Sequence, residues 1–331
     1  MTTALVTASV LGFGSALVDV LAHVDEDFRA SIPGIKGGTE LVDSHTMAAI
    51  VRRLPQAPRQ APGGSAANTI VGYAKLGGKA ALLAKIGLDD AGVFYRQDMQ
   101  RAGVDTTPFK ATGDTDTGRC LSLITPDSER TMRTYMGAAA TLRPDELSLD
   151  DFRGYSHFYC EGYALFSREL TFRALDLARA AGMVICLDLS APEVVLAAKD
   201  ILPVLLRDYV HAVFANEQEA AAFCGSNDPV AGLDALAAHC PLAVLKLGRQ
   251  GVRLRERGGE VIAVPACSVK AIDSTGAGDL WAAGFLYGWL RGWPLHAAAE
   301  LGAKVAAAVV QVTGAVIPDD VWTAIRRDLP A

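Results

Sequence analysis

Strand-like and helix-like blocks of apolar and polar residues follow one another along most of the chain. Five short runs are apolar almost throughout, which is typical of parallel strands covered on both faces; they are residues 80–86, 157–160, 183–189, 210–215 and 242–247. Helical stretches lie between or beside them, at residues 168–181, 193–206, 217–224 and 230–239. This alternation predicts an α/β fold with a doubly wound, mostly parallel sheet.

Two segments interrupt this rhythm, at about residues 14–42 and 107–136. Both are rich in Thr, Gly and β-branched residues, and they predict short antiparallel strands that form one small sheet. The proline-rich stretch 54–62 predicts a loop. A small sheet beside a ligand cleft acts as a lid. We therefore expect a single domain over residues 1–331 with a discontinuous β lid.

The sharpest local pattern is the segment Asp273–Asp279 (DSTGAGD), followed by residues 280–290, which are apolar on every face. A helix that is apolar all round is buried. The glycines before it leave backbone N–H groups free at a helix N-terminus, which is an anion site. Asp279 would repel a phosphate there, unless its carboxylate accepts the proton of a hydroxyl that attacks phosphorus. The alternative is a simple N-terminal cap.

Composition and charge exclude several classes of protein. The chain has 331 residues, and 31 Lys+Arg against 37 Asp+Glu give a net charge of −6, which argues against nucleic acid as a partner. Mean hydropathy is +0.23, yet no apolar run is long enough to span a membrane, and residues 1–18 lack the basic region of a secretory signal. Six scattered cysteines without CxxC or HExxH patterns predict a cytoplasmic protein without disulfides or zinc.

Familiar nucleotide motifs are absent, including the dinucleotide fingerprint, the P-loop and the HRD and DFG triplets of protein kinases. Four other motifs occur in the order found in the ribokinase/PfkB family of sugar and nucleoside kinases, and the chain resembles that family from about residue 12 to 318. They are Gly63–Asn68 (GGSAAN), Asn216–Glu219 (NEQE), Lys246–Gly251 (KLGRQG), with Lys where Thr is common, and Asp273–Asp279.

Within that family the chain is most similar to the adenosine kinase branch. The similarity rests on residues 14–19 (GSALVD), 128–131 (SERT), 137–140 (GAAA) and 313–314 (TG). Ser15 replaces an Asn often found there. No aromatic residue for stacking on a base stands out, so that Tyr163 and Phe166 are the candidates.

The resemblance implies roles for individual residues on the acceptor side. Asp279 would be the general base toward the substrate hydroxyl, and the amides of Gly276, Ala277 and Gly278 would surround the transferring phosphoryl group. Asp19 would bind vicinal ribose hydroxyls, since a carboxylate accepts two hydrogen bonds. The further substrate residues would be Gly63, Gly64, Ser65, Asn68, Glu161 and Tyr163.

On the ATP side, the resemblance implies that Asn216, Lys246, Gly248 and Gly251 contact the nucleotide. Asn216 and Glu219 would hold Mg²⁺ through water, although the same pair also fits a helix capping box. Asp273 would support a monovalent cation such as K⁺. Arg133, in the expected lid, is either a phosphate or substrate partner or an exposed strand residue.

The resemblance thus implies an ATP- and Mg²⁺-dependent kinase that phosphorylates the 5′-hydroxyl of a ribonucleoside, with adenosine and purine salvage as the first expectation. A kinase for ribose, fructose or a related sugar is the alternative within the family. A non-catalytic nucleoside- or sugar-binding regulator is the alternative outside catalysis. The partners are small molecules, and the relatives occur as monomers or as homodimers paired through the lid.

Overall fold

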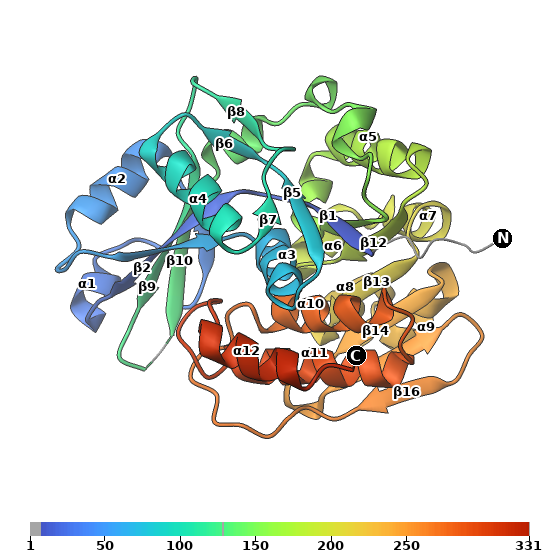
Figure 1. The fold of residues 1–331 in the computed structure, drawn as a ribbon. Helices are drawn as coiled ribbons and strands as arrows, with labels where there is room; N and C mark the ends of the chain where they lie inside the picture. Colours follow the sequence, from blue (N-terminus) through green and yellow to red (C-terminus); the bar gives the residue numbers. More distant parts are fainter. Residues whose placement is uncertain (1–7, 128, 331) are drawn as a thin grey trace.

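A nine-stranded sheet forms the centre of the computed structural model, which describes residues 8–127 and 129–330 (Figure 1). The strand order is β16-β15-β14-β13-β12-β11-β1-β5-β7. Neighbours from β14 to β7 run parallel, and β15 and β16 form an antiparallel edge. The strands of this main sheet are β1 (Ser9–Phe13), β5 (Lys79–Leu83), β7 (Val104–Asp105), β11 (His157–Glu161), β12 (Val184–Asp188), β13 (Ala212–Asn216), β14 (Leu242–Lys246), β15 (Val252–Glu256) and β16 (Val261–Val264).

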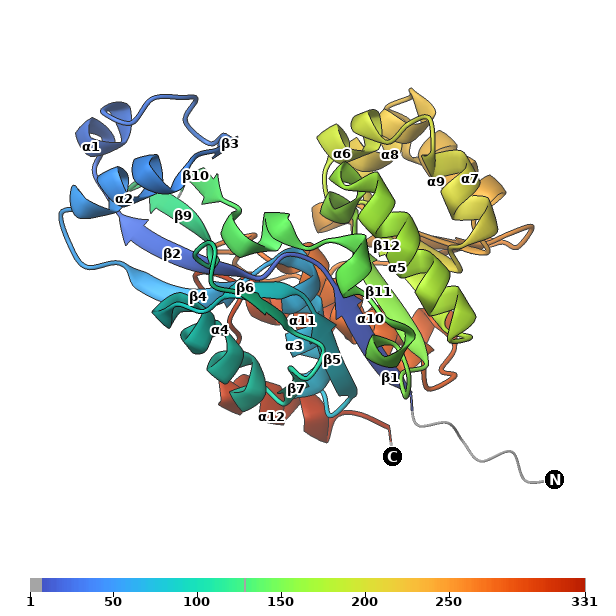
Figure 2. The same cartoon turned by 90° about the horizontal axis from the view of Figure 1, so that it is seen from above.

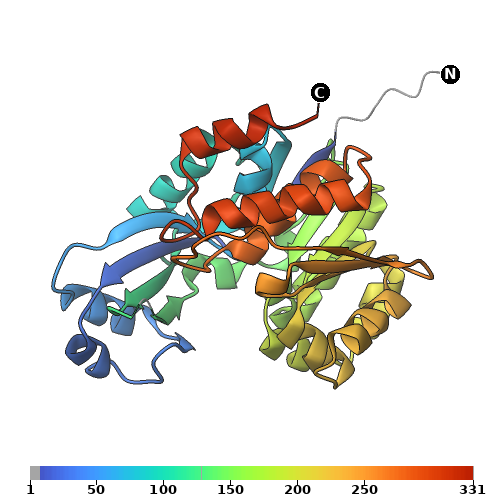
Figure 3. The same cartoon turned by 90° about the horizontal axis from the view of Figure 1, so that it is seen from below.

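Helices cover both faces of the main sheet, as the sequence predicts for a doubly wound fold. One face buries α5 (Arg168–Ala180), α6 (Pro192–Ala197), α7 (Leu202–Asp208), α8 (Glu217–Cys224) and α9 (Pro229–His239). The other face buries α3 (Ser65–Lys75), α4 (Asp90–Arg101), α10 (Ala277–Trp289) and α11 (Leu295–Val309). Figure 3 shows the C-terminal helices in orange and red, where α12 (Asp319–Arg327) packs beside α11 through Trp322.

The predicted helix 193–206 is two helices in the structure, α6 and α7. Pro203 causes the break, because proline lacks the N–H that a continuing helix needs and is tolerated only in the first turn. It stands in the first turn of α7. Likewise, the predicted strand 80–86 divides into β5 and β6 (Lys85–Gly87), and β6 leaves the main sheet to pair with β8 (Lys110–Thr112).

A second sheet of five strands projects from one side of the main sheet (Figure 2). We call it the small sheet; its order is β3 (Thr39–Leu41), β10 (Arg130–Tyr135), β9 (Gly118–Ile124), β2 (Leu17–His23) and β4 (Arg59–Gly63). Its pairing is mixed and not purely antiparallel as predicted, because β2 runs parallel to β9 and β3 runs parallel to β10. That it closes over a ligand stays a prediction. Of the similarity segment 128–131, Ser128 lies outside the described residues.

The segment predicted as a proline-rich loop contributes β4 to the small sheet. Proline removes a ladder donor and is therefore confined largely to edge strands. β4 is such an edge, and Pro62 within it pairs with Val18. The outer face of the small sheet is covered by α1 (Glu26–Ala30) and α2 (Ser44–Arg52), with Val20, Leu121 and Leu123 in the shared core.

The apolar helix predicted after Asp279 is α10, and nearly all of its residues from Leu280 to Gly288 are buried. It contacts α3 on one side and α11 on the other. Among the described residues, the structure contains no helix with the length and apolarity needed to span a membrane. Because α10 packs between α3 and α11, its N-terminus is held in place next to the sheet edge described below.

Candidate active site

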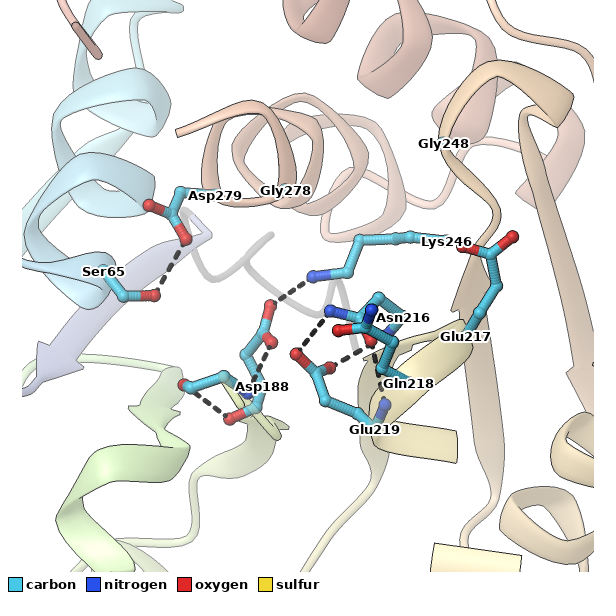
Figure 4. Close-up of a pocket in the computed structure, with 11 residues that line it drawn as sticks. Ser65, Asp188, Asn216, Glu217, Gln218, Glu219, Lys246, Gly248, Gly278 and Asp279 are labelled. Atoms are coloured by element: carbon cyan, nitrogen blue, oxygen red, sulfur yellow. Dashed lines mark hydrogen bonds and ion pairs between the residues drawn. The ribbon is translucent and has the colours of Figure 1, made fainter. Parts of the chain in front are cut away.

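A cavity of about 340 Å³ lies where the carboxyl ends of three parallel strands face the N-terminus of α10. Ligands bind at this edge in open α/β sheets. Asp188, Asn216 and Lys246 are the last residues of β12, β13 and β14 and reach into it (Figure 4). The full lining is Ser65, Asp188, Ser190, Asn216, Glu217, Gln218, Glu219, Lys246, Gly248, Gly278 and Asp279.

Asp279, in the first turn of α10, joins two motifs that are more than 200 residues apart in the sequence. Its carboxylate accepts hydrogen bonds from Ser65 Oγ at 2.8 Å and from Asn68 Nδ2 at 2.9 Å, both on α3. Burial raises the pKa of Asp279 to about 6, the bonds from Asn68 and Ser65 oppose that rise, and the charge of Asp188 adds to it. The result is a carboxylate that is ionised at neutral pH and more basic than usual.

The turn before α10 presents fewer free amides than predicted. Gly276 has a φ of +71°, and a Cβ there would stand 2.6 Å from Ala315 Cβ, so that only glycine fits. The Ala277 N–H donates to the Ser274 carbonyl at 3.2 Å and is already used in the turn. Within residues 8–127 and 129–330, the amides of Gly276 and Gly278 have no such acceptor. These two amides, and not three, fit an anion hole.

Asn216 and Glu219 form a reciprocal capping box at the start of α8. Asn216 N and Nδ2 donate to the Glu219 carboxylate at 2.8 and 2.7 Å, and Glu219 N donates to Asn216 Oδ1 at 2.9 Å. The capping box that the sequence offered as the alternative is therefore present in the structure. Burial, with a contribution from the charge of Asp188, raises the pKa of Glu219 to about 7. Both residues also line the cavity, so that the cap places a carboxylate where a hydrated cation can approach.

On the small sheet, Asp19 lies directly against Gly63. A Cβ on Gly63 would stand 2.3 Å from Asp19 Oδ1, so glycine leaves the space that this carboxylate occupies. Gly64 follows with a φ of +103°, and a Cβ there would collide with the Ser15 carbonyl. Burial raises the pKa of Asp19 to about 7, Arg130 opposes this rise and Asp279 adds to it. The carboxylates of Asp19 and Asp279 are thus close enough for electrostatic repulsion between them.

Glu161 lies outside the cavity lining and is held by backbone amides, and its role toward a substrate stays a prediction. It is buried, and its two oxygens accept the amides of Ser15 and Ala66 at 2.8 and 2.9 Å, which ties the start of β2 to the start of α3. Tyr163, in the following turn, is 43% exposed and lies outside the cavity lining, as does Phe166. The aromatic stacking residue predicted from the sequence is therefore not identified at either position.

Two further predicted site residues lie outside the lining of the cavity. Gly251 does not line the cavity, because it packs against the Val264 carbonyl at the start of β15; Gly248 does line it. The carboxylate of Asp273 pairs with Arg130 and accepts the amides of Thr275 at 3.0 Å and Gly314 at 2.7 Å, and its role at a monovalent cation stays a prediction.

Arg133 is not an exposed strand residue either. It is 1% exposed and donates to the carbonyls of Met132 and Pro33.

The sequence reasoning missed Asp188, together with Ser190, Glu217 and Gln218. Asp188 accepts hydrogen bonds from Lys246 Nζ at 2.8 Å and from the Tyr159 hydroxyl at 3.1 Å. The sequence did carry a signal, because Asp188 is the penultimate residue of the predicted strand 183–189, and the carboxyl ends of parallel strands converge on one sheet edge. Ser190, the one non-glycine residue with positive φ among the described residues, caps the turn by accepting the Gly162 N–H at 2.8 Å.

The fold and this cavity define a ribokinase-like kinase, a phosphotransferase with an alcohol group as acceptor and ATP as co-substrate. Residues 40–322 match the pfkB family carbohydrate kinases, and the chain belongs to that family.

Similar proteins include both nucleoside and sugar kinases. The adenosine kinase from Sinorhizobium meliloti is 32% identical, with 98% of this chain and 100% of that chain covered and a TM-score of 0.88. A probable sugar kinase protein from Rhizobium etli CFN 42 is 30% identical, with 97% and 98% covered and a TM-score of 0.88. The adenosine kinase from Saccharomyces cerevisiae is 28% identical, with 95% of this chain and 98% of the relative covered.

Proposed function

We propose that this kinase transfers the γ-phosphoryl group of ATP to the 5′-hydroxyl of a ribonucleoside, with adenosine as the first substrate, and thereby serves purine salvage. The observation that carries the proposal is the setting of Asp279. It stands at the N-terminus of a buried helix, accepts hydrogen bonds from Ser65 and Asn68, lines the cavity and is close enough to Asp19 to interact with it electrostatically. Relatives named as adenosine kinases over nearly their whole length support the choice of substrate.

In this proposal Asp279 is the general base. The acceptor hydroxyl gives its proton to the Asp279 carboxylate while its oxygen bonds to the γ-phosphorus and the bond to ADP breaks. A pKa of about 6 keeps the carboxylate ionised at neutral pH while making it a stronger base. The amides of Gly276 and Gly278, at the positive end of the α10 dipole, stabilise the charge on the transferring group.

The small sheet offers room for a base beside the ribose. Its register aligns Asp19, Cys120, Thr134 and Leu41 across four neighbouring strands, so these four side chains share one face. Thr134 is two strand spacings from Asp19, about 10 Å, which is near the length of a nucleoside. Thr134 and Leu41 also line a second cavity of about 300 Å³. This arrangement favours a nucleoside over a small sugar.

The cavity next to Asp279 suits Mg·ATP. Its lining carries the carboxylates of Asp188, Glu217, Glu219 and Asp279, which would repel a bare triphosphate. No cluster of three or more His, Cys, Asp or Glu side chains among the described residues is arranged to chelate a metal directly. Mg²⁺ keeps several waters and binds phosphates, so Asn216 and Glu219 would hold it through water. When bound, it neutralises phosphate charge. K⁺ is not part of the proposal, because Asp273 is engaged elsewhere.

The test is an ADP-release assay with Mg·ATP over a panel of nucleosides and sugars. We expect the highest kcat/KM for adenosine. Preference for ribose or fructose would support the sugar kinase instead. Tight binding without turnover of any compound would indicate a regulator.

The role of Asp279 is tested by Asp279→Asn, which keeps the shape and removes the base. We expect kcat to fall by roughly 10²–10⁴-fold with little change in acceptor affinity measured by calorimetry. Asp319→Asn, on exposed α12, is the matched control and should leave kcat unchanged. Full activity of the Asp279 variant would remove this residue from the mechanism.

A further inference from the structure

Lys246 occupies a position that the strand register directs toward α10. Asp188 pairs with Phe214, and Lys246 pairs with Asn216 two residues further along β13. Because side chains alternate along a strand, Asp188, Phe214 and Lys246 point to the same face of the main sheet. On that face Phe214 packs against Phe285 of α10, with ring centroids 5.8 Å apart. The Lys246 side chain therefore lies between the sheet edge and the start of α10.

The ammonium group sits at the helix N-terminus itself. A Cβ built on Gly278 would stand 3.2 Å from Lys246 Nζ, so the ammonium lies next to one of the two free amides. Figure 4 shows Lys246 pointing across the cavity toward Asp188, from the side opposite Ser65. A cation at a helix N-terminus is disfavoured by the helix dipole. The carboxylates of Asp188, Glu219 and Asp279 offset this cost, and a phosphoryl group at the same amides would be a further partner for the charge of Lys246.

Lys246 is also the single cationic side chain among the residues that line the cavity, all of which the structure describes. Burial by itself would lower the pKa of Lys246, but the charges of Asp188, Glu219 and Asp279 outweigh it, and the net shift is upward. The group thus carries a permanent positive charge at neutral pH. It is not suited to exchange a proton with a substrate.

We propose that Lys246 supplies a fixed positive charge to the transferring phosphoryl group, and that Asp188 is a positioning residue that holds the ammonium in place. The inference rests on the proposed position of that group at the N-terminus of α10. In the step itself the γ-phosphorus bonds to the acceptor oxygen, the bond to the ADP oxygen breaks, and the hydroxyl proton goes to Asp279. Lys246 attracts the phosphoryl oxygens throughout and gives up no proton.

Asp188 is itself oriented by hydrogen bonds that lead back to α10. The Tyr159 hydroxyl donates to Asp188 Oδ2 at 3.1 Å. The Thr69 hydroxyl lies 3.3 Å from that of Tyr159 and 3.1 Å from the Asp279 carbonyl. The Lys246 ammonium is therefore bound by the buried Asp188 carboxylate, which is connected through the hydroxyls of Tyr159 and Thr69 to the backbone of Asp279.

The first test compares Lys246→Met, Lys246→Arg and the exposed control Lys304→Met on α11, with kcat and KM measured for ATP and for the acceptor that the wild type turns over. We expect Lys246→Met to lose about 10²–10³-fold in kcat with an unchanged acceptor KM, as for the loss of one charge-stabilising donor. Lys246→Arg keeps the charge and should recover at least tenfold of that loss. A kcat for Lys246→Met within threefold of the wild type overturns the proposal.

The second test addresses Asp188 through a double-mutant cycle. If Asp188 acts only by holding Lys246, Asp188→Asn lowers kcat in the wild type but has no further effect in Lys246→Met. The double variant removes both members of the Asp188–Lys246 pair, so Asp188 does not remain as a buried carboxylate without its partner, and thermal unfolding should show the variant folded. Effects on kcat that multiply would show that Asp188 acts independently, and would overturn its positioning role.

Asp279→Asn, measured in parallel, separates the two proposals. An inactive Asp279 variant beside a fully active Lys246→Met refutes the role of Lys246 alone. A fully active Asp279 variant refutes the proposed site, whatever Lys246 does.

Discussion

At the scale of single residues, the same physical effect acts on several carboxyl groups, and their partners give them different uses. Burial raises the pKa of Asp19, Glu161 and Glu219 to about 7 and that of Asp279 to about 6. Glu161 accepts one backbone amide on each of its two oxygens, and Glu219 is held in a capping box. Asp279 accepts hydrogen bonds from the side chains of Ser65 and Asn68 and lines the cavity, which leaves it suited to take a proton.

This setting of Asp279 predicts an acidic limb in the pH profile. If Asp279 is the base it must be ionised, so kcat at saturating acceptor and ATP should rise with pH through about 6 and then level off. The kcat/KM for the acceptor should also follow Asp19, whose pKa is about 7. Ser65→Ala removes a hydrogen bond that lowers the pKa, and it should shift the limb to higher pH. The exposed Ser268→Ala is the control and should leave the profile unchanged. A limb below pH 5 in the wild type would contradict the assignment of the base to Asp279.

At the scale of elements, α10 depends on close packing against α11. A Cβ on Gly284 would stand 2.8 Å from both Gly302 Cα and the Leu301 carbonyl oxygen, which are backbone atoms that cannot rotate away. The two helices therefore approach each other through glycines. Because α10 begins at the proposed anion hole, a change in this contact should also affect the site.

We expect Gly284→Ala to force α10 and α11 apart. The free energy of unfolding should fall by about 1–3 kcal/mol, the usual cost of overpacking a core, as measured by denaturant titration. Gly113→Ala is the control, because a Cβ there meets only Leu88 Cδ1 at 3.8 Å. Equal stability of both variants would show that the helix contact adapts at no cost.

At the scale of the whole molecule, the ion pair of Arg130 and Asp273 joins the small sheet to the segment before α10, a helix that covers the main sheet. Arg130 belongs to β10, and Asp273 precedes α10; both side chains are about 10% exposed. Arg130 also opposes the upward shift of the Asp19 pKa. The pair thus fixes the sheet that carries Asp19 and keeps Asp19 more acidic than burial alone would allow.

Arg130→Met should accordingly weaken acceptor binding more than ATP binding. Without Arg130 the pKa of Asp19 rises above about 7, so Asp19 is protonated at neutral pH and accepts hydrogen bonds poorly. We expect the acceptor KM to rise roughly tenfold at pH 7, a loss of about 1.4 kcal/mol, and to recover in part as the pH is raised. Arg153→Met, in an exposed pair, is the control. If the KM for ATP rose more than the KM for the acceptor, the role of Arg130 in acceptor binding would be contradicted.

Local sequence patterns predicted the elements that carry their own signals. The apolar runs gave the parallel strands β11 to β14, and the DSTGAGD turn before an apolar stretch predicted the buried α10. The predictions from these local patterns were wrong where a single residue overrides the pattern around it. Pro203 divides one predicted helix into two. Pro62 made the local pattern of residues 54–62 predict a loop, whereas the structure has the strand β4 there. A proline is tolerated in this strand because β4 is at the edge of the small sheet.

By itself the sequence determined the doubly wound α/β class and the motifs that carry the chemistry, because both depend on periodicity and spacing within short segments. Only the tertiary structure decided which side chains meet: Ser65 and Asn68 on Asp279, Asp188 on Lys246, and Arg130 on Asp273. These contacts join residues 58 to 214 positions apart. They are fixed by strand order and register, which place chain-distant strand ends at one sheet edge and which no local pattern specifies.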